Sequence, residues 1–133
     1  MGFGSGGSKF GSGYPGAVAR TATADGTGTG LIANGTTFVT VTSGGANTII
    51  TLPAPIPGTV VWLLTEGDST GFEVRTSAVA TVKINGGAGT AFESAIAAAI
   101  VAVRFVCVSA TYWLGTQFDA DGDESKVEAA NNS

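Results

Sequence analysis

The amino-acid sequence predicts an all-β domain, a single β-sandwich or jelly-roll-like barrel of about seven or eight short strands with an extended N-terminal arm. Three observations support this prediction. The chain is rich in glycine, threonine, alanine and valine, a composition that disfavours long helices and suits strands joined by tight turns. Short apolar or alternating runs recur between residues 36 and 118. Turn residues separate these runs at the spacing typical of sandwiches and barrels.

The chain divides into three segments by composition. Residues 1–30 are a glycine-rich and serine-rich arm and linker, residues 31–118 form the β-domain, and residues 119–133 are an acidic tail that we expect to be flexible. The chain is 44% hydrophobic and only 12% charged, whereas about a quarter of the residues in an average soluble domain are charged. We therefore expect part of its apolar surface to meet other protein.

The first 16 residues carry the candidate partner-binding side chains. Glycine and serine dominate this stretch, so by itself it should be flexible, because glycine loses the most backbone entropy on ordering. Phe3, Phe10 and Tyr14 interrupt it and are the expected anchors on a partner. The alternatives are that the arm is a plain linker or that it folds back on its own domain.

The first half of the β-domain contains three expected strands. Residues 36–42 alternate, with Phe38 on one face and two valines on the other. Residues 48–52 form a short apolar strand. Residues 53–58 contain three prolines and cannot donate a full ladder of hydrogen bonds, so they predict a crossing or edge segment. Residues 59–65 are almost wholly apolar, as expected of a strand that is covered on both faces.

The second half begins with an alternating strand at residues 72–76. Residues 82–87 combine a short strand with an Asn-Gly-Gly turn of the type found in hairpins. The alanine-rich residues 91–99 are ambiguous, and we expect a loop or one helical turn there. Residues 101–108 and 111–118 predict two strands around a Ser-Ala turn.

The residue types that catalysis needs are scarce in this chain. It has no histidine, which removes Ser/His and Cys/His nucleophilic systems. Cys107, the single cysteine, lies in an apolar run and is predicted to be a buried core thiol. Asp119 begins a run of alternate aspartates with the spacing of a calcium loop, but Glu124 stands where that loop needs glycine. We therefore expect a solvated acidic tail, no enzymatic activity, no metal and no cofactor.

Charge and hydropathy also limit the partners. The net charge is −4 and the six basic residues are scattered, so we expect no direct binding to nucleic acid. The most apolar stretch, residues 95–108, is shorter than the ~20 residues that span a bilayer. The first residues lack the pattern of a secretory signal. We expect a protein made in the cytoplasm and not associated with a membrane.

Several short motifs resemble a β-domain that recurs in the virion proteins of tailed bacteriophages. They are the TLPAP run at 51–55 followed by Gly58, Trp62 in the next apolar strand, the VKINGG run at 82–87, and a final pair of strands with Cys107 and Trp113. The family includes head decoration proteins, also called cement proteins, and some fibre proteins. The resemblance covers residues 36–118 and implies a trimer-forming β-domain that is attached to a capsid or a tail.

This resemblance implies a head decoration protein. We expect it to be made in the host cytoplasm, to bind the major capsid protein on the outer head surface of the virion as a homotrimer, and to stabilise the head. The first alternative is a receptor-binding domain of a tail or fibre. Such a domain would expose clustered aromatic residues such as Trp62 or Trp113, whereas decoration would bury both. The second alternative is a carbohydrate-binding sandwich in which the same aromatic residues line a groove.

Overall fold

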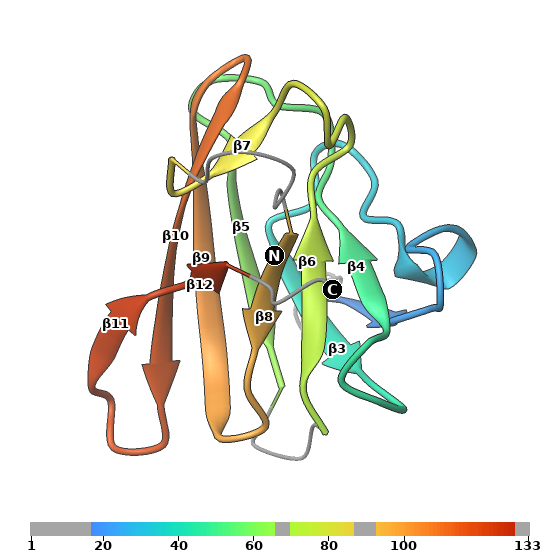
Figure 1. Cartoon of the computed structure of the whole chain (residues 1–133), viewed down its shortest axis with the longest axis vertical. Coiled ribbons are helices and arrows are strands. Elements are labelled where there is room, and N and C mark those ends of the chain that lie inside the picture. The colour runs from blue at the N-terminus through green and yellow to red at the C-terminus, as the bar shows by residue number, and fades with distance from the viewer. Residues whose placement is uncertain (1–16, 66–69, 87–92, 130–133) are drawn as a thin grey trace, which may run out of the picture.

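The fold is a sandwich of two β-sheets, as predicted from the sequence. The computed structural model describes residues 17–65, 70–86 and 93–129. In Figure 1 the four-stranded sheet lies in front of the larger, seven-stranded sheet. Apart from one short 3-10 turn, η1 (Gly28–Gly30), all the regular structure in these residues is β.

Eleven strands are present in the described part of the chain. The seven-stranded sheet contains β2 (Ala17–Thr21), β3 (Phe38–Thr42), β5 (Val60–Leu64), β7 (Lys83–Ile84), β9 (Ile100–Ser109), β10 (Tyr112–Asp119) and β11 (Glu124–Lys126). Its order is β11-β10-β9-β5-β3-β2, and β7 pairs with β10. The four-stranded sheet contains β4 (Ile49–Thr51), β6 (Phe72–Arg75), β8 (Glu93–Ile96) and β12 (Glu128–Ala129). Its order is β12-β8-β6-β4.

A long hairpin of β9 and β10 forms the centre of the larger sheet, and it confirms the two strands predicted around the Ser-Ala turn. The two strands pair antiparallel, with Trp113 opposite Cys107 and Phe118 opposite Ala102. On its other side β9 pairs antiparallel with β5. Side chains therefore alternate between the two faces of this sheet along three adjacent strands.

Parallel pairs account for much of the remaining topology. The pairs β2–β3, β3–β5, β4–β6 and β7–β10 are all parallel. Parallel neighbours need long connections, so the chain passes repeatedly from one sheet to the other. Residues 53–58 make one such passage, from β4 in the smaller sheet to β5 in the larger. This agrees with the crossing segment that the three prolines predicted.

The core lies between the two sheets. Its largest fully buried side chains are Trp113, Phe72 and Phe105. The apolar residues of β5 and β9 that face inward, such as Val61 and Val103, are also fully buried. Burial of apolar surface on this scale is the main stabilising contribution to such a fold.

The sheets extend beyond the β-domain expected at residues 31–118. Ahead of it, residues expected in the linker form β2 and pair with β3. Behind it, residues expected in a flexible tail form β11 and β12, and Val127 between them is only 3% exposed. These segments escaped prediction because they are short, small or acidic, and they are held by pairing with other strands, β2 with β3, β11 with β10 across a short turn, and β12 with the distant β8.

One local prediction in the second half of the domain was wrong. Within the alanine-rich stretch, residues 93–96 form β8 instead of a loop or helical turn. Pairing with β6 and burial of Ile96 outweigh the helix preference of alanine. The predicted turn at Asn85 and Gly86 is present, with φ values of 53° and 67°, and the short strand before it, β7, pairs parallel with β10.

The thiol of Cys107 is buried, as predicted, and this has a consequence for stability. Its side chain is 1% exposed and donates to the backbone oxygen of Ser109 at 3.1 Å. Burial raises the pKa of the Cys107 thiol above its ordinary value of 9.0. The folded state therefore favours the protonated thiol.

We expect the free energy of unfolding to fall as the pH rises above about 9, because the thiol of the unfolded chain ionises more readily than the buried one. The contribution of Cys107 is fully present below pH 9 and is lost as the pH rises through its folded-state pKa. Denaturation measured from pH 8 to 10.5 on the protein and on Cys107→Ala checks this. Identical pH dependences of the two proteins would contradict it.

Candidate interaction surface

The side of the seven-stranded sheet that faces away from the core is the main candidate for function. We call the outward-pointing residues of β3, β5, β9 and β10 the outer face. The strand register arranges them in rows. One row runs Phe38, Trp62, Arg104, Thr116; the next runs Thr40, Leu64, Ala102, Phe118; and a third runs Val60, Val106, Leu114. Most of these side chains are apolar, and Arg104 is the one charged residue among them.

Two aromatic rings and a guanidinium group meet in the middle of the outer face. The rings of Trp62 and Phe118 stack, with centroids 5.8 Å apart and an interplanar angle of 28°. Between their strands lies Ala102, which is small enough for the rings to meet above it. The guanidinium carbon of Arg104 is 5.8 Å from the centre of the Trp62 ring, within the range of a cation–π interaction. The positive charge of Arg104 is thus partly stabilised by the face of the Trp62 ring.

The outer face leaves large apolar side chains open to solvent. Phe38 is 43% exposed, Leu114 is 48% exposed, and Val108, further along β9, is 54% exposed. A sheet with one solvated face normally alternates apolar inward and polar outward residues. Here β5 is apolar on both sides, and β9 is apolar on both sides except at Arg104. The expectation that residues 59–65 are covered on both faces is therefore met on the inner side only, since Trp62 and its outward neighbours are half-buried within the described chain.

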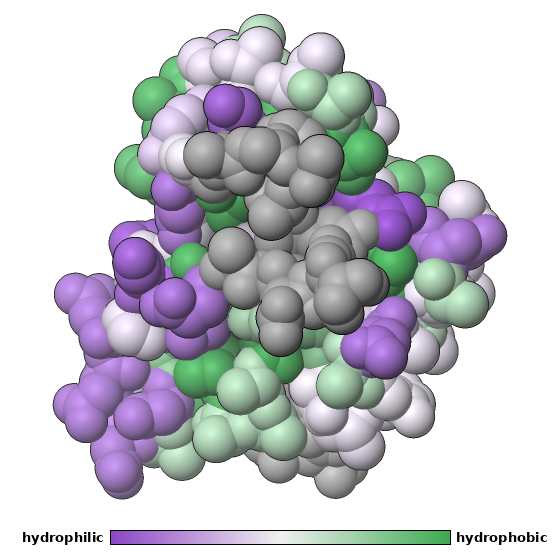
Figure 2. Space-filling model, viewed as in Figure 1, coloured by the Kyte–Doolittle hydropathy of each residue, from purple (hydrophilic) through white to green (hydrophobic). Residues whose placement is uncertain are grey.

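One edge of the larger sheet is polar in contrast. Figure 2 has hydrophilic residues gathered over β11 and the turn that joins it to β10. There the Asp119 carboxylate accepts hydrogen bonds from the backbone N–H groups of Asp121 and Asp123, at 2.9 and 3.0 Å. Asp119 therefore shapes the turn by capping its own backbone. No group of three or more potential metal ligands occurs among the residues that the structure describes.

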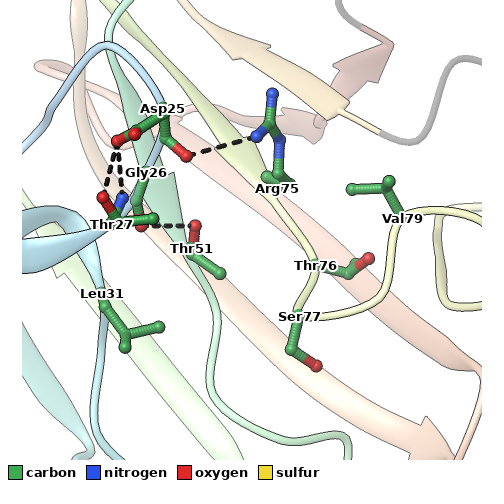
Figure 3. A pocket seen from close by; sticks show the side chains of 9 residues that line it. All are labelled: Asp25, Gly26, Thr27, Leu31, Thr51, Arg75, Thr76, Ser77 and Val79. Atoms are coloured by element: carbon green, nitrogen blue, oxygen red, sulfur yellow. Dashed lines mark hydrogen bonds between the residues drawn. The ribbon is translucent and has the colours of Figure 1, made fainter.

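A pocket of about 380 Å³ lies at the other side of the molecule. It is lined by Asp25, Gly26, Thr27, Leu31, Thr51, Arg75, Thr76, Ser77 and Val79 (Figure 3). Asp25 accepts hydrogen bonds from the hydroxyl and the backbone N–H of Thr27, at 2.7 and 3.1 Å. These bonds, the hydroxyl first, hold the pKa of Asp25 below its usual range.

The polar groups of this pocket are engaged in holding the loop of residues 25–27. Arg75 donates to the backbone oxygen of Asp25 at 3.3 Å, and Thr51 donates to that of Gly26 at 2.8 Å. Among the described lining residues Asp25 is the single carboxylate, whereas glycoside hydrolysis requires a pair of acids. The described lining also contains no aromatic ring on which a sugar could stack. The pocket therefore gives no support to the carbohydrate-binding alternative.

The structure separates the aromatic residues singled out in the sequence. Phe3, Phe10 and Tyr14 lie outside the described residues. Trp113 is fully buried in the core, whereas Trp62 lies on the outer face. Sequence reasoning did not bring Trp62 together with Phe118, because the two residues are far apart along the chain. The signal that could have found the surface is the apolar character of β5 and β9 on both faces, which Arg104 alone interrupts.

Comparisons with protein-family models, curated proteins and solved structures find no match to this chain. Among the described residues, none of the helical structure is long and apolar enough to cross a membrane.

Proposed function

We propose that this protein is a non-enzymatic structural component of a tailed-phage virion. It binds the major capsid protein on the outside of the head, assembles there as a homotrimer, and acts as cement. The observation that carries this proposal is the apolar outer face, which requires a protein cover that the described chain does not supply. The motif resemblance supports the phage setting, and the all-β sandwich suits that family.

Adhesion by several copies explains how such a protein would work without chemistry. A flexible arm binds weakly because ordering it costs about 1–2 kcal/mol per residue of backbone entropy. Linking three arms through one trimer raises the effective concentration of each, so avidity exceeds a single contact by roughly 10²–10⁴. A trimer that bridges neighbouring capsid subunits then resists the outward pressure of packaged DNA.

The second candidate is a receptor-binding domain of a tail or fibre. The observation that favours it is the aromatic cluster of Trp62, Phe118 and Phe38 outside the core. However, these side chains lie on strands, whereas a receptor-binding tip would place them on loops. We therefore rank it below capsid decoration.

Adding the protein to undecorated heads should raise the temperature at which they release DNA. The reason is linkage: a ligand that binds only the intact lattice stabilises it by RT ln(1 + [L]/Kd) per site. The measurement is DNA release on heating, with a nucleic-acid dye, at increasing protein concentration. Identical release curves at saturating occupancy would reject the cement function.

The matched control for this experiment is the protein without residues 1–16. If Phe3, Phe10 and Tyr14 anchor the arm on the capsid, the truncated protein should keep its fold but should co-sediment poorly with heads and leave the release temperature unchanged. Undiminished co-sedimentation of the truncated protein would show that the arm is a plain linker. Binding of the full chain to host cells, lost in Trp62→Ala, would favour the receptor-binding candidate.

A further inference from the structure

We infer that the outer face of the seven-stranded sheet is the surface through which copies of this chain contact one another. This inference rests on the proposed function in one respect, the assembly into a homo-oligomer, and it names the surface that performs it. The inference starts from apolar side chains of β5 and β9 that the rest of the described chain does not cover. Strands β5 and β9 have the apolar pattern of strands covered on both sides, yet the described chain covers only their inner side.

The size of the outer face suits protein association. Four neighbouring strands about 4.8 Å apart, each with five residues at about 3.3 Å per residue, give roughly 300 Å² in projection. Apolar patches of about 300–600 Å² are the largest found on typical monomers and are often functional. A standard interface buries about 800 Å² per partner. One pair of faces would therefore associate weakly, and we expect assembly that depends on concentration in the micromolar range.

The chemistry of the outer face points to a second copy as its occupant. A phosphate-bearing partner would require clustered cations, whereas those of this face lie apart: Arg104 has its guanidinium over Trp62, and Lys126 and Lys83 pair at the rim with different residues of β10, Thr116 and Tyr112. A second copy brings the same apolar rows, and three copies can turn these strand faces toward a common threefold axis. A second copy also brings Glu124, which is paired in register with Phe118 at the rim, as a carboxylate for the neighbour's Arg104.

Residues 1–16 of the same chain are a poor match to this surface. Seven of these 16 residues are glycine, and only three carry aromatic side chains. The apolar rows of the outer face run over four strands, so the three aromatic rings of residues 1–16 would leave most of the row residues uncovered. A neighbouring sheet would cover all three rows at once.

Two substitutions on different strands test the inference, and a third is the matched control. Leu114→Glu and Phe38→Lys each place a charge on the outer face. Ile56→Glu places the negative charge of Leu114→Glu on a different side chain, which is 55% exposed and lies in the crossing segment outside the rows of the outer face. Sedimentation velocity from 1 to 100 μM gives the oligomeric state of each protein, and circular dichroism checks that each is folded.

We expect the unmodified protein and Ile56→Glu to assemble as the concentration rises, and both outer-face variants to remain monomers. A second readout uses the two tryptophans, because Trp113 is buried and Trp62 is half-buried at the surface. The fraction of fluorescence that acrylamide quenches should fall on assembly in the unmodified protein and stay constant in folded outer-face variants.

Three results would overturn the inference. The first is an unmodified protein that is still a monomer at 100 μM. The second is assembly of both outer-face variants, and the third is assembly of one of them, to the same extent as the unmodified protein. A monomer whose Trp62 becomes shielded only on phage heads would assign the outer face to the capsid protein instead. Failure here is distinct from failure of the cement function, since oligomeric state is measured on the free protein and DNA release on decorated heads.

Discussion

Replacing Trp113 by alanine is expected to destabilise the domain by about 3–5 kcal/mol, the usual cost of removing a large buried aromatic side chain. Trp113 is fully buried and belongs to the core cluster, to which both sheets contribute. Its strand pairs with β9 on one side and with β7 on the other, at Cys107 and Ile84. The cavity would therefore open where three strands meet. Urea denaturation followed by circular dichroism measures the loss.

Trp113→Phe is the informative control for this prediction. The indole nitrogen of Trp113 is buried and has no hydrogen-bond partner among the described residues. Removing the N–H group should therefore cost no hydrogen bond, and phenylalanine refills much of the volume. We expect a clearly smaller loss than for alanine. If alanine itself changes stability by less than about 1 kcal/mol, the value typical of surface positions, the indole is not a core group.

Replacing Asn85 by alanine is expected to cost about 2–4 kcal/mol, because three side-chain hydrogen bonds are lost together. The Asn85 amide donates to the backbone oxygens of Gly115 and Val127, at 2.9 and 3.1 Å. Its oxygen accepts from the N–H of Gly115 at 2.8 Å. This one side chain therefore joins the turn after β7 to β10 and to the residue between β11 and β12. Denaturation gives the overall loss, and hydrogen exchange should accelerate most at the N–H of Gly115, which donates directly to the Asn85 oxygen.

Asn85→Gly separates the hydrogen bonds from the backbone conformation at this position. Asn85 has a φ of 53°, which is unfavourable for alanine but open to glycine. Both variants lose the three hydrogen bonds, whereas only alanine adds backbone strain. We expect glycine to be destabilised as well, by less than alanine. Stability close to that of the unmodified protein in the glycine variant would show that the bonds contribute little.

Local sequence patterns predicted the central strands well. The pair around the Ser-Ala turn, the crossing segment with its three prolines and the buried thiol of Cys107 all depend on signals that lie within a few residues. Alternation sets which side chains share a face, prolines prevent ladder hydrogen bonds, and an apolar run buries its cysteine. Such signals persist in the folded chain because they need no distant partner.

The tertiary structure alone decided the strands at either end of the domain. The acidic residues of β11 and the small residues of β2 carry no strand pattern, and pairing with β10 and β3 holds them in place. The same is true of β8, where burial of Ile96 overrides the helix preference of alanine. Strand pairing decides such segments because the partner strand supplies the hydrogen bonds and the cover.

The candidate interaction surface needed both kinds of information. The sequence by itself determined that β5 and β9 are apolar on both faces apart from Arg104, since this is visible as two long apolar runs. Only the tertiary structure decided which face is left outside, and it brought Trp62, Arg104 and Phe118 together on that face. The physical reason is strand register, which places residues from distant parts of the chain side by side and which periodicity alone does not specify.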